Sequence, residues 1–439
     1  MNHFLPVGLL ENFNIVRITE LCNVSEKSHY LEINLEENNK ILQDLDCSLY
    51  ESKGFTEITL HDFPLRGKAV FLILKRRRWR LKSDKQVVVR NEFPYVAEGS
   101  GFTKDLSEFL KVEIDRRIDT ITNIGSYYGV NSEKLNRHYK KKTSGFNDWA
   151  QKEHAEKYLL FEENIGSNLS IDEVNLSKGE LYTFLTNKSG KGRNGTLVAC
   201  IKGTLSKDII EVLEKISIEK RLKVTEVTLD MAKNMESAMK KVFPNAKLVT
   251  DRFHVVRLPM EALQHIRVNI KWKEMDKENA AVKLAKQRNE KYKPEELANG
   301  DTHKQLLARS RYALAKNESE WTENQKERTA ILFTQYPELK TAYHQTMAFR
   351  NIYEDRTISS ARIRFTDWCN NILEKQIKEF YTVANTVKNN LDNILNFFIN
   401  RSTNANAESF NSKLKLFRAN LRGVTDTKFF LFRLTKLFA

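Results

Sequence analysis

Residues 168–255 carry short apolar or alternating segments separated by turn residues, a pattern typical of β-strands. The predicted strands are residues 169–174, 180–187, 196–203, 224–230 and 246–253. Helical stretches interrupt this series at residues 206–221 and 231–243. The order is therefore three strands, a helix, a strand, a helix and a strand. Short turns between the first three strands favour an antiparallel meander, and the later strand–helix–strand units favour parallel pairing.

Helical spacing also follows Thr103, which we expect to begin a helix. Further on, a short helix is predicted to end at Tyr128, where Gly129 can supply the positive φ of a tight turn, and a second helix starts with Ser132 as its N-cap. This is the helix-turn-helix pattern, whose second helix can enter a DNA groove. The residues expected to face outward are Lys134, Arg137, His138, Lys140, Lys141 and Lys142. An ordinary pair of packed helices is the alternative.

A basic segment lies between Arg66 and Arg90, with Asp84 as its single acid. Residues 69–74 and 86–89 predict short strands, with the basic run between them as the turn of a hairpin. Such a run repels itself unless a polyanion offsets its charge, which favours contact with DNA phosphates over a merely solvated turn. The candidate contact residues are Arg76, Arg77, Arg78, Trp79 and Arg80.

Composition narrows the function classes. The chain has 439 residues, a formal net charge of +15 and 41% apolar residues, so it can form packed cores and favours a polyanionic partner. Gly and Pro number 16 and 7, which disfavours an all-β protein. The four cysteines are too far apart for a disulfide framework or a paired-cysteine zinc site, so we expect reduced thiols. No apolar run suits a membrane span or signal peptide, so a cytoplasmic, nucleoid-associated protein is expected.

Two aspartates occupy corresponding places on predicted strands. Asp172 lies inside the first strand, where an unpaired carboxylate is costly to bury, and Asp230 follows the apolar residues 224–229 at the end of the fourth. The order of elements is that of the RNase H-like fold, in which these strands are central neighbours, so the two carboxylates would meet. Repelling carboxylates need a cation, and hard oxygen ligands suit Mg²⁺ or Mn²⁺. The alternative for Asp230 is an N-cap of the following helix.

A third carboxylate would have to come from a later helix. Glu408 is the candidate, because it shares a helical face with Asn411 and Lys415 that is distinct from the apolar face. An isolated glutamate on a helix more often faces solvent. Basic residues in the same segment would contact DNA, namely Lys415, Arg418 and Arg422.

Asp251 and His254 close the fifth predicted strand. Their spacing could suit a zinc site, but no cysteine stands beside them. A hydrogen-bonded structural pair that stiffens the exit from the strand is the favoured interpretation.

These motifs resemble the ISL-three family of bacterial insertion-sequence transposases. Residues 227–267 resemble its central motif, an aspartate before a helix, then a Pro-Asn-Ala turn and Asp-Arg-Phe-His. Residues 170–187 resemble its first catalytic strand, residues 404–424 its closing glutamate helix, and residues 61–80 its Pro-x-x-Gly entry into an Arg-rich strand. The resemblance covers most of residues 55–439.

The resemblance implies a DDE transposase with an RNase H-like core. Carried over to this sequence, Asp172, Asp230 and Glu408 would be the catalytic triad and would bind two Mg²⁺ or Mn²⁺ ions. Asp251 and His254 would support that core without holding metal. Family members commonly carry paired cysteines after the Arg-rich strand, and this chain has none there, so no zinc is predicted.

The expected fold class is an α+β, α-rich multidomain protein. In it, a helix-turn-helix region precedes an RNase H-like α/β core that is interrupted by a long helical insertion. The expected domains are 1–98 (basic, strand-containing), 99–145 (helix-turn-helix), 165–258 (first part of the core), 259–400 (helical insertion) and 401–439 (glutamate-bearing helix).

The expected function is transposition of an insertion sequence, a form of DNA recombination. The protein would bind the terminal inverted repeats and target DNA as a dimer or higher oligomer, and would cleave and transfer DNA strands. The alternatives are a helix-turn-helix regulator without catalysis, an RNase H-like nuclease specific for branched DNA, and a decayed element that still folds.

Overall fold

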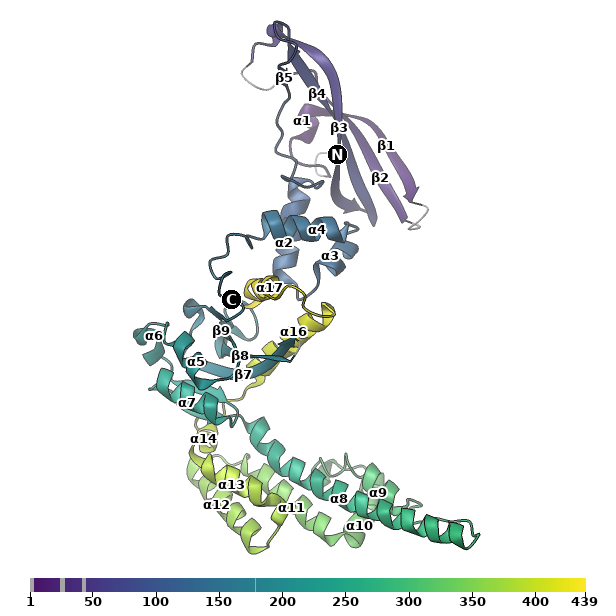
Figure 1. Cartoon of the computed structure of the whole chain (residues 1–439), viewed down its shortest axis with the longest axis vertical. Helices are drawn as coiled ribbons and strands as arrows, with labels where there is room; N and C mark the ends of the chain where they lie inside the picture. Colours follow the sequence, from purple (N-terminus) through teal and green to yellow (C-terminus); the bar gives the residue numbers. More distant parts are fainter. Residues whose placement is uncertain (1–3, 24–27, 42–44, 178) are drawn as a thin grey trace.

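The computed structural model describes residues 4–23, 28–41, 45–177 and 179–439. The chain is an elongated α/β molecule with two mixed sheets and many helices (Figure 1). The N-terminal sheet stands at one end, followed by a group of short helices, the second sheet and a helical region at the other end. Within the described ranges, no helix is both long and apolar enough to cross a membrane.

The N-terminal sheet has the strand order β1-β2-β4-β3, with β5 paired to β4. Its strands are β1 (Phe13–Asn23), β2 (Ser28–Glu37), β3 (Tyr50–Leu65), β4 (Lys68–Leu81) and β5 (Val88–Val89). The β2–β4 pair is parallel and the other pairs are antiparallel. The short helix α1 (Leu9–Asn12) packs on β1.

The prediction of a turn at the arginine run was wrong, because residues 75–80 continue β4. Glu57 on β3 lies opposite Lys75, and Glu51 opposite Arg80. Opposite charges across neighbouring strands offset the repulsion that suggested a turn. The hairpin turn lies earlier, at Arg66 and Gly67, which both have positive φ.

Helices α2 (Lys104–Arg116), α3 (Ile121–Tyr127) and α4 (Ser132–His138) follow the sheet. Thr103 caps α2 as predicted, and Gly129 has a φ of 66° in the turn before α4. The N-cap of α4 is Asn131 rather than Ser132, since the Asn131 side chain accepts the backbone N–H of Lys134. His138 was predicted to face outward but is buried, and its Nε2 lies 2.7 Å from Ser107 Oγ.

The second sheet has the order β11-β10-β7-β8-β9-β6. Its strands are β6 (Tyr158–Leu160), β7 (Asn168–Ser177), β8 (Glu180–Asn187), β9 (Leu197–Lys202), β10 (Glu226–Leu229) and β11 (Lys247–Thr250). The β7–β8–β9 meander is antiparallel, whereas β7, β10 and β11 run parallel, as the segment pattern predicts. Strand β6 was not predicted.

Helices cover both faces of this sheet. One face packs on α5 (Ser206–Leu213) and α7 (Lys233–Val242), and the other on α16 (Ala405–Asn420) and α17 (Thr427–Phe438). The predicted helix at 206–221 is two helices, α5 and the short α6 (Ile218–Leu222). The covered sheet keeps β7 at its centre, with β10 on one side and β8 on the other.

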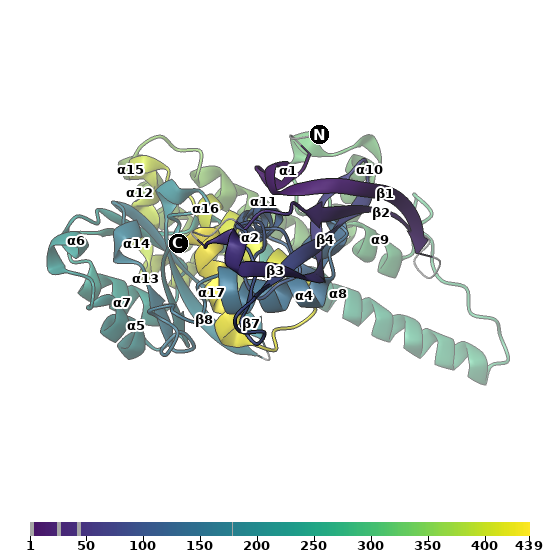
Figure 2. The ribbon, with the colours of Figure 1, turned by 90° about the horizontal axis from the view of Figure 1, so that it is seen from above.

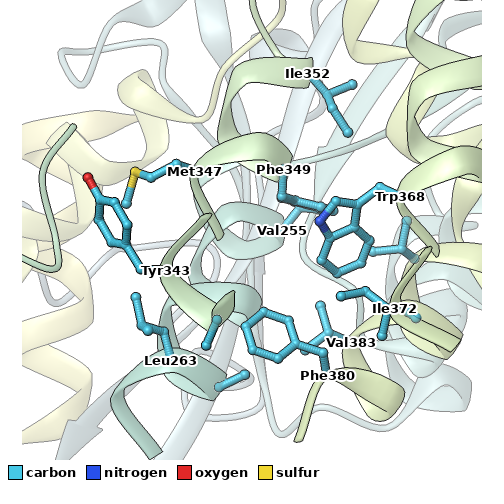
Figure 3. Close-up of a cluster of buried hydrophobic side chains, with 14 of the residues drawn as sticks. Val255, Leu263, Tyr343, Met347, Phe349, Ile352, Trp368, Ile372, Phe380 and Val383 are labelled. Atoms are coloured by element: carbon cyan, nitrogen blue, oxygen red, sulfur yellow. The ribbon is translucent and has the colours of Figure 1, made fainter. Parts of the chain in front are cut away.

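The helical region between β11 and α16 has its own apolar core, part of which is drawn in Figure 3. Its main helices are α8 (Arg252–Gln287), α9 (His303–Arg309), α10 (Glu323–Gln335), α11 (Pro337–Ile352), α12 (Ile358–Glu374), α13 (Tyr381–Asn389), α14 (Leu391–Leu395) and α15 (Phe397–Asn400). Helix α8 begins before Pro259, which lies inside it. Viewed from above, its far end projects well clear of the rest of the molecule (Figure 2).

Candidate active site

Asp172 and Asp230 lie at corresponding places along two neighbouring parallel segments of the chain. Ser170 of β7 pairs with Thr228 of β10, and each aspartate stands two residues further along its own chain. Asp172 is still within β7, whereas Asp230 follows the last residue of β10. The register of the sheet therefore brings the two predicted acids side by side.

The surroundings of Asp172 disfavour its negative charge. Burial raises the pKa of Asp172, and the nearby charge of Asp230 raises it further. Hydrogen bonds act in the opposite direction, because Oδ1 accepts the backbone N–H of Glu173 at 2.8 Å and Oδ2 accepts the Asn411 side-chain amide at 2.6 Å. A positive charge on His254 would also lower this pKa. One neighbouring acid and one histidine thus act on the Asp172 carboxylate.

Two further residues belong to this group. Burial raises the pKa of Glu173, and the charges of Asp230 and Asp172 add to the rise. Asn411 was placed on the face of Glu408 by its spacing, but its contact with Asp172 was not foreseen. Two sequence features could have indicated these residues. Glu173 directly follows Asp172 in β7, and Asn411 lies three positions after Glu408.

Asp230 does not cap the following helix. Its Oδ1 accepts the backbone N–H of Ala232 at 2.8 Å, which forms a local turn after β10. The N-cap of α7 is Ala232 itself. The alternative interpretation of Asp230 as a helix cap is therefore wrong.

Asp251 and His254 stand where β11 passes into α8. The Asp251 residue is 2% exposed, and its Oδ2 has no hydrogen-bond partner among the described residues. His254 Nε2 lies 3.9 Å from this oxygen, which is too far for the hydrogen bond that we predicted. Burial raises the pKa of Asp251, and the charge of Glu408 contributes to the rise.

Glu408 lies in the first turn of α16 and is exposed. Its charge acts on Asp251, whereas the charge acting on Asp172 comes from Asp230. In the described part of the chain, no group of three or more His, Cys, Asp or Glu side chains is arranged to hold a metal ion. The three predicted ligands therefore do not form a closed cluster.

The donor set nevertheless fits a hard divalent cation. Carboxylate oxygens are the ligands that Mg²⁺ and Mn²⁺ favour, and such ions need few protein ligands when a phosphate is also present. A nearby cation would stabilise the negative charge at Asp172, which burial disfavours. It would also stabilise Oδ2 of Asp251, which has no hydrogen-bond partner among the described residues. A divalent cation at this sheet edge would therefore meet oxygen donors of the kind that it prefers.

The basic residues of α4 line a groove of about 370 Å³. Lys134 and Arg137 are exposed there, and residues 99–101 also line the groove. Lys140 is partly buried and pairs with Asp426 at 2.5 Å. The groove is an exposed cationic surface of the kind that contacts phosphates.

The arginine run of β4 makes contacts within the protein. Trp79 is 4% exposed and belongs to the core. The Arg77 guanidinium bonds to Glu36 at 3.0 Å, and the Arg80 Nε bonds to Glu51 at 2.5 Å. Arg76 bonds to the Asn91 backbone carbonyl, and the Nε of Arg78 is buried without a partner among the described residues.

The basic residues after Glu408 differ in their surroundings. Arg418 donates to the Asn175 carbonyl of β7 at 2.6 Å, so it links α16 to the sheet. Lys415 is exposed on α16, and Arg422 is exposed in the turn that follows. The latter two can reach solvent or DNA.

Comparison with known proteins identifies the family. No curated protein matches the chain significantly. A family model of the ISL-three group of DDE type, described as a transposase, matches residues 169–434. This range spans more than half of the chain and includes β7, β10, β11, the helical region and α16. The chain therefore belongs to the ISL-three family of transposases, enzymes that cleave and transfer DNA.

Proposed function

We propose that this transposase binds the ends of an insertion sequence and catalyses metal-dependent cleavage and transfer of their strands through Asp172, Asp230 and Glu408. The proposal is carried by the corresponding positions of Asp172 in β7 and Asp230 directly after β10, each two residues beyond the paired Ser170 and Thr228. Glu408 is proposed because α16 packs on β7 and its Asn411 contacts Asp172.

The strand arrangement supports an RNase H-like core. The antiparallel meander β7–β8–β9 is followed by β10 and β11, which are parallel to β7 on its other side. The helical region, proposed as residues 259–400, interrupts this core before α16. The remaining proposed domains are 1–98, 99–145, 165–258 and 401–439.

When bound, two Mg²⁺ or Mn²⁺ ions would activate the attacking water or DNA 3′-hydroxyl and offset charge at the phosphate. Asp172, Asp230 and Glu408 would hold them. Asn411 orients Asp172 by its hydrogen bond, and Asp251 and His254 support the site from the end of β11. Burial at Asp172 limits the water that competes for its carboxylate.

DNA binding is proposed for three basic surfaces: the arginine strand β4, the α4 groove and the end of α16. In the α4 region, a helix-turn-helix would place Lys134 and Arg137 against the duplex, with Lys140 beside them. A dimer or higher oligomer would bring two element ends together.

The test is incubation of the full chain with DNA that carries the junctions flanking its own gene. With Mg²⁺ or Mn²⁺, new 3′ ends at those junctions are expected, and products joined to a target DNA should follow. Specific binding without metal-dependent cleavage would contradict the proposal and favour a regulator. Cleavage of branched DNA without any strand transfer would favour a structure-specific nuclease.

A further inference from the structure

A buried ion pair lies beneath the candidate site and is not part of the proposed triad. Lys188 follows β8, and Glu226 opens β10. The Lys188 Nζ lies 2.9 Å from Glu226 Oε1, and their side chains are 10% and 5% exposed. Lys188 also bonds to Thr228 of β10. Both residues are charged groups removed from water, at the end of the sheet where β8 ends and β10 begins.

This pair holds the segment that returns the chain from the helical region to α16. Ser402 Oγ accepts a 2.7 Å hydrogen bond from Lys188 and donates one to Glu226. Asn400 donates to the other Glu226 oxygen at 3.3 Å. Beyond the segment, Asn406 in the first turn of α16 donates to the Lys188 carbonyl at 3.0 Å. We call residues 400–404 the connector.

The connector touches all three strands that lead to the candidate acids. It meets β10 through Glu226, and β7 through a hydrogen bond from Ser170 to Asn404. The Asn404 backbone also acts on Asp251 at the end of β11, because it lowers the pKa of that carboxyl. The Asn404 carbonyl in turn accepts the backbone N–H of Glu408 at 2.9 Å. The connector therefore leads directly into the first turn of α16, which carries Glu408.

The other end of the connector is fixed to the helical region. Arg401 has a φ of 49°, a left-handed conformation that is uncommon outside glycine and that ends α15. Its guanidinium bonds to the backbone carbonyls of Tyr353 and Asp355. The connector is thus bonded to both the sheet and the insertion.

The energetics favour a role in geometry. Removing two charges from water costs free energy that their attraction only partly returns, so an apolar pair of similar size is often as stable. Burial alone would raise the pKa of Glu226, but hydrogen bonds from Ser402 and Lys188 lower it, which favours the carboxylate form of Glu226. Directional charged hydrogen bonds fix one arrangement, whereas an apolar pair would allow several.

We propose that Lys188 and Glu226 are positioning residues that set Glu408 against Asp172 and Asp230 through the connector. This inference rests on the proposed function. It assigns a role to two buried residues outside the triad.

The test measures metal binding separately from activity. Binding of Mn²⁺ to the folded state raises the melting temperature, so a titration with MnCl₂ gives a half-saturating concentration without DNA. The main variant is the double substitution Lys188→Met and Glu226→Leu, which leaves no unpaired buried charge. Ser402→Ala is the milder variant, because it keeps the ion pair and removes only its hydroxyl link to the connector.

Both variants are expected to keep DNA binding and to need more Mn²⁺. The half-saturating concentration should rise about tenfold or more in the double variant, a range typical of residues that orient metal ligands, and less in Ser402→Ala. Cleavage should fall in the same order. The matched control is Asp301→Asn, which removes a buried carboxylate that bonds to Arg309 and Arg328 in the helical region. It should leave the Mn²⁺ midpoint unchanged.

The outcomes distinguish the two proposals. In one outcome, Asp172→Asn removes the Mn²⁺ effect, whereas the double variant and Ser402→Ala both fold and keep the wild-type Mn²⁺ midpoint. The positioning role would then be wrong, and the proposed triad would stand. If the double variant fails to fold, an unchanged midpoint and cleavage rate in Ser402→Ala overturns the role alone. If the wild type shows neither a Mn²⁺ effect nor cleavage, the proposed function fails and this inference with it.

Discussion

The side-chain amide of Asn411 on α16 donates a 2.6 Å hydrogen bond to Asp172 Oδ2 on β7. This contact joins the helix that carries Glu408 to the strand that carries the first candidate acid. Asn411 is 8% exposed, so water does not readily replace the bond. Hydrogen bonds to a charged carboxylate are stronger than those between neutral groups.

Removal of this bond should slow cleavage without unfolding the protein. Asn411→Ala is expected to reduce the cleavage rate about tenfold to a hundredfold, because a hydrogen bond to a charged group contributes about 1.5–3 kcal/mol. Rates measured under single-turnover conditions would check this. The exposed neighbour provides the control, and Ser412→Ala should cleave at the wild-type rate. Equal rates for both variants would remove Asn411 from the site.

The α4 groove should account for part of the salt dependence of DNA binding. Lys134→Ala combined with Arg137→Ala is expected to weaken binding and to reduce the slope of log K against log salt by about 2, one per lost phosphate contact. Fluorescence anisotropy at several salt concentrations measures this slope. An unchanged slope would place the DNA elsewhere.

The arginines of β4 give a different expectation. Arg77 is already bonded to Glu36 and to the Glu37 carbonyl, so Arg77→Ala should change the salt slope less than Arg137→Ala does. Its main effect is expected on the stability of the N-terminal sheet. The same anisotropy titration, paired with thermal melting, separates the two effects. A loss of slope equal to that of Arg137→Ala would show that Arg77 leaves its partners for DNA.

Asp301 in the helical region should stabilise the folded protein by an amount that depends on pH. Burial would raise the pKa of Asp301, but hydrogen bonds from Arg328 and Arg309 lower it below its usual 3.8. A lowered carboxylate pKa stabilises the folded state above the unfolded value and loses that effect as the pH falls through the folded value. Asp301→Asn should therefore lower the free energy of unfolding at pH 7. We expect a loss of only about 1 kcal/mol, because solvent screens the exposed Arg309.

Urea unfolding of the wild type and Asp301→Asn checks this prediction. The stability difference should stay constant from pH 7 to pH 5 and shrink below about pH 4. A difference that grows as the pH falls would have the wrong sign for a carboxylate with a lowered pKa.

The sequence predicted the second sheet well because its strands differ clearly from their surroundings. The segment at 180–187 is β8 with the same limits, and the parallel and antiparallel pairings follow from which segments a helix separates. Asp172 and Asp230 were found because an acid at a buried strand is unusual. The two acids come close to one another only if their strands are adjacent in the sheet. The order of strands and helices along the chain was the one indication of that adjacency.

Other features depend on distant contacts that local patterns do not contain. The basic run of β4 suggested a turn because its partners Glu51 and Glu57 lie on another strand. Burial of His138 likewise depends on Ser107 of α2. Lys188 and Glu226 escaped notice because each, taken alone, is an ordinary charged residue, and only the fold brings them to Ser402.

The most direct test of the central claim compares DNA cleavage by the wild type, Asp230→Asn and Glu211→Gln at saturating Mn²⁺ and equal DNA occupancy. Glu211 is an exposed acid on α5 and serves as the control. We predict that Asp230→Asn binds the element ends like the wild type but cleaves them about a thousandfold or more slowly, since a metal-bound transition state loses several kcal/mol. Glu211→Gln should cleave normally. Cleavage by Asp230→Asn near the wild-type rate would contradict the account.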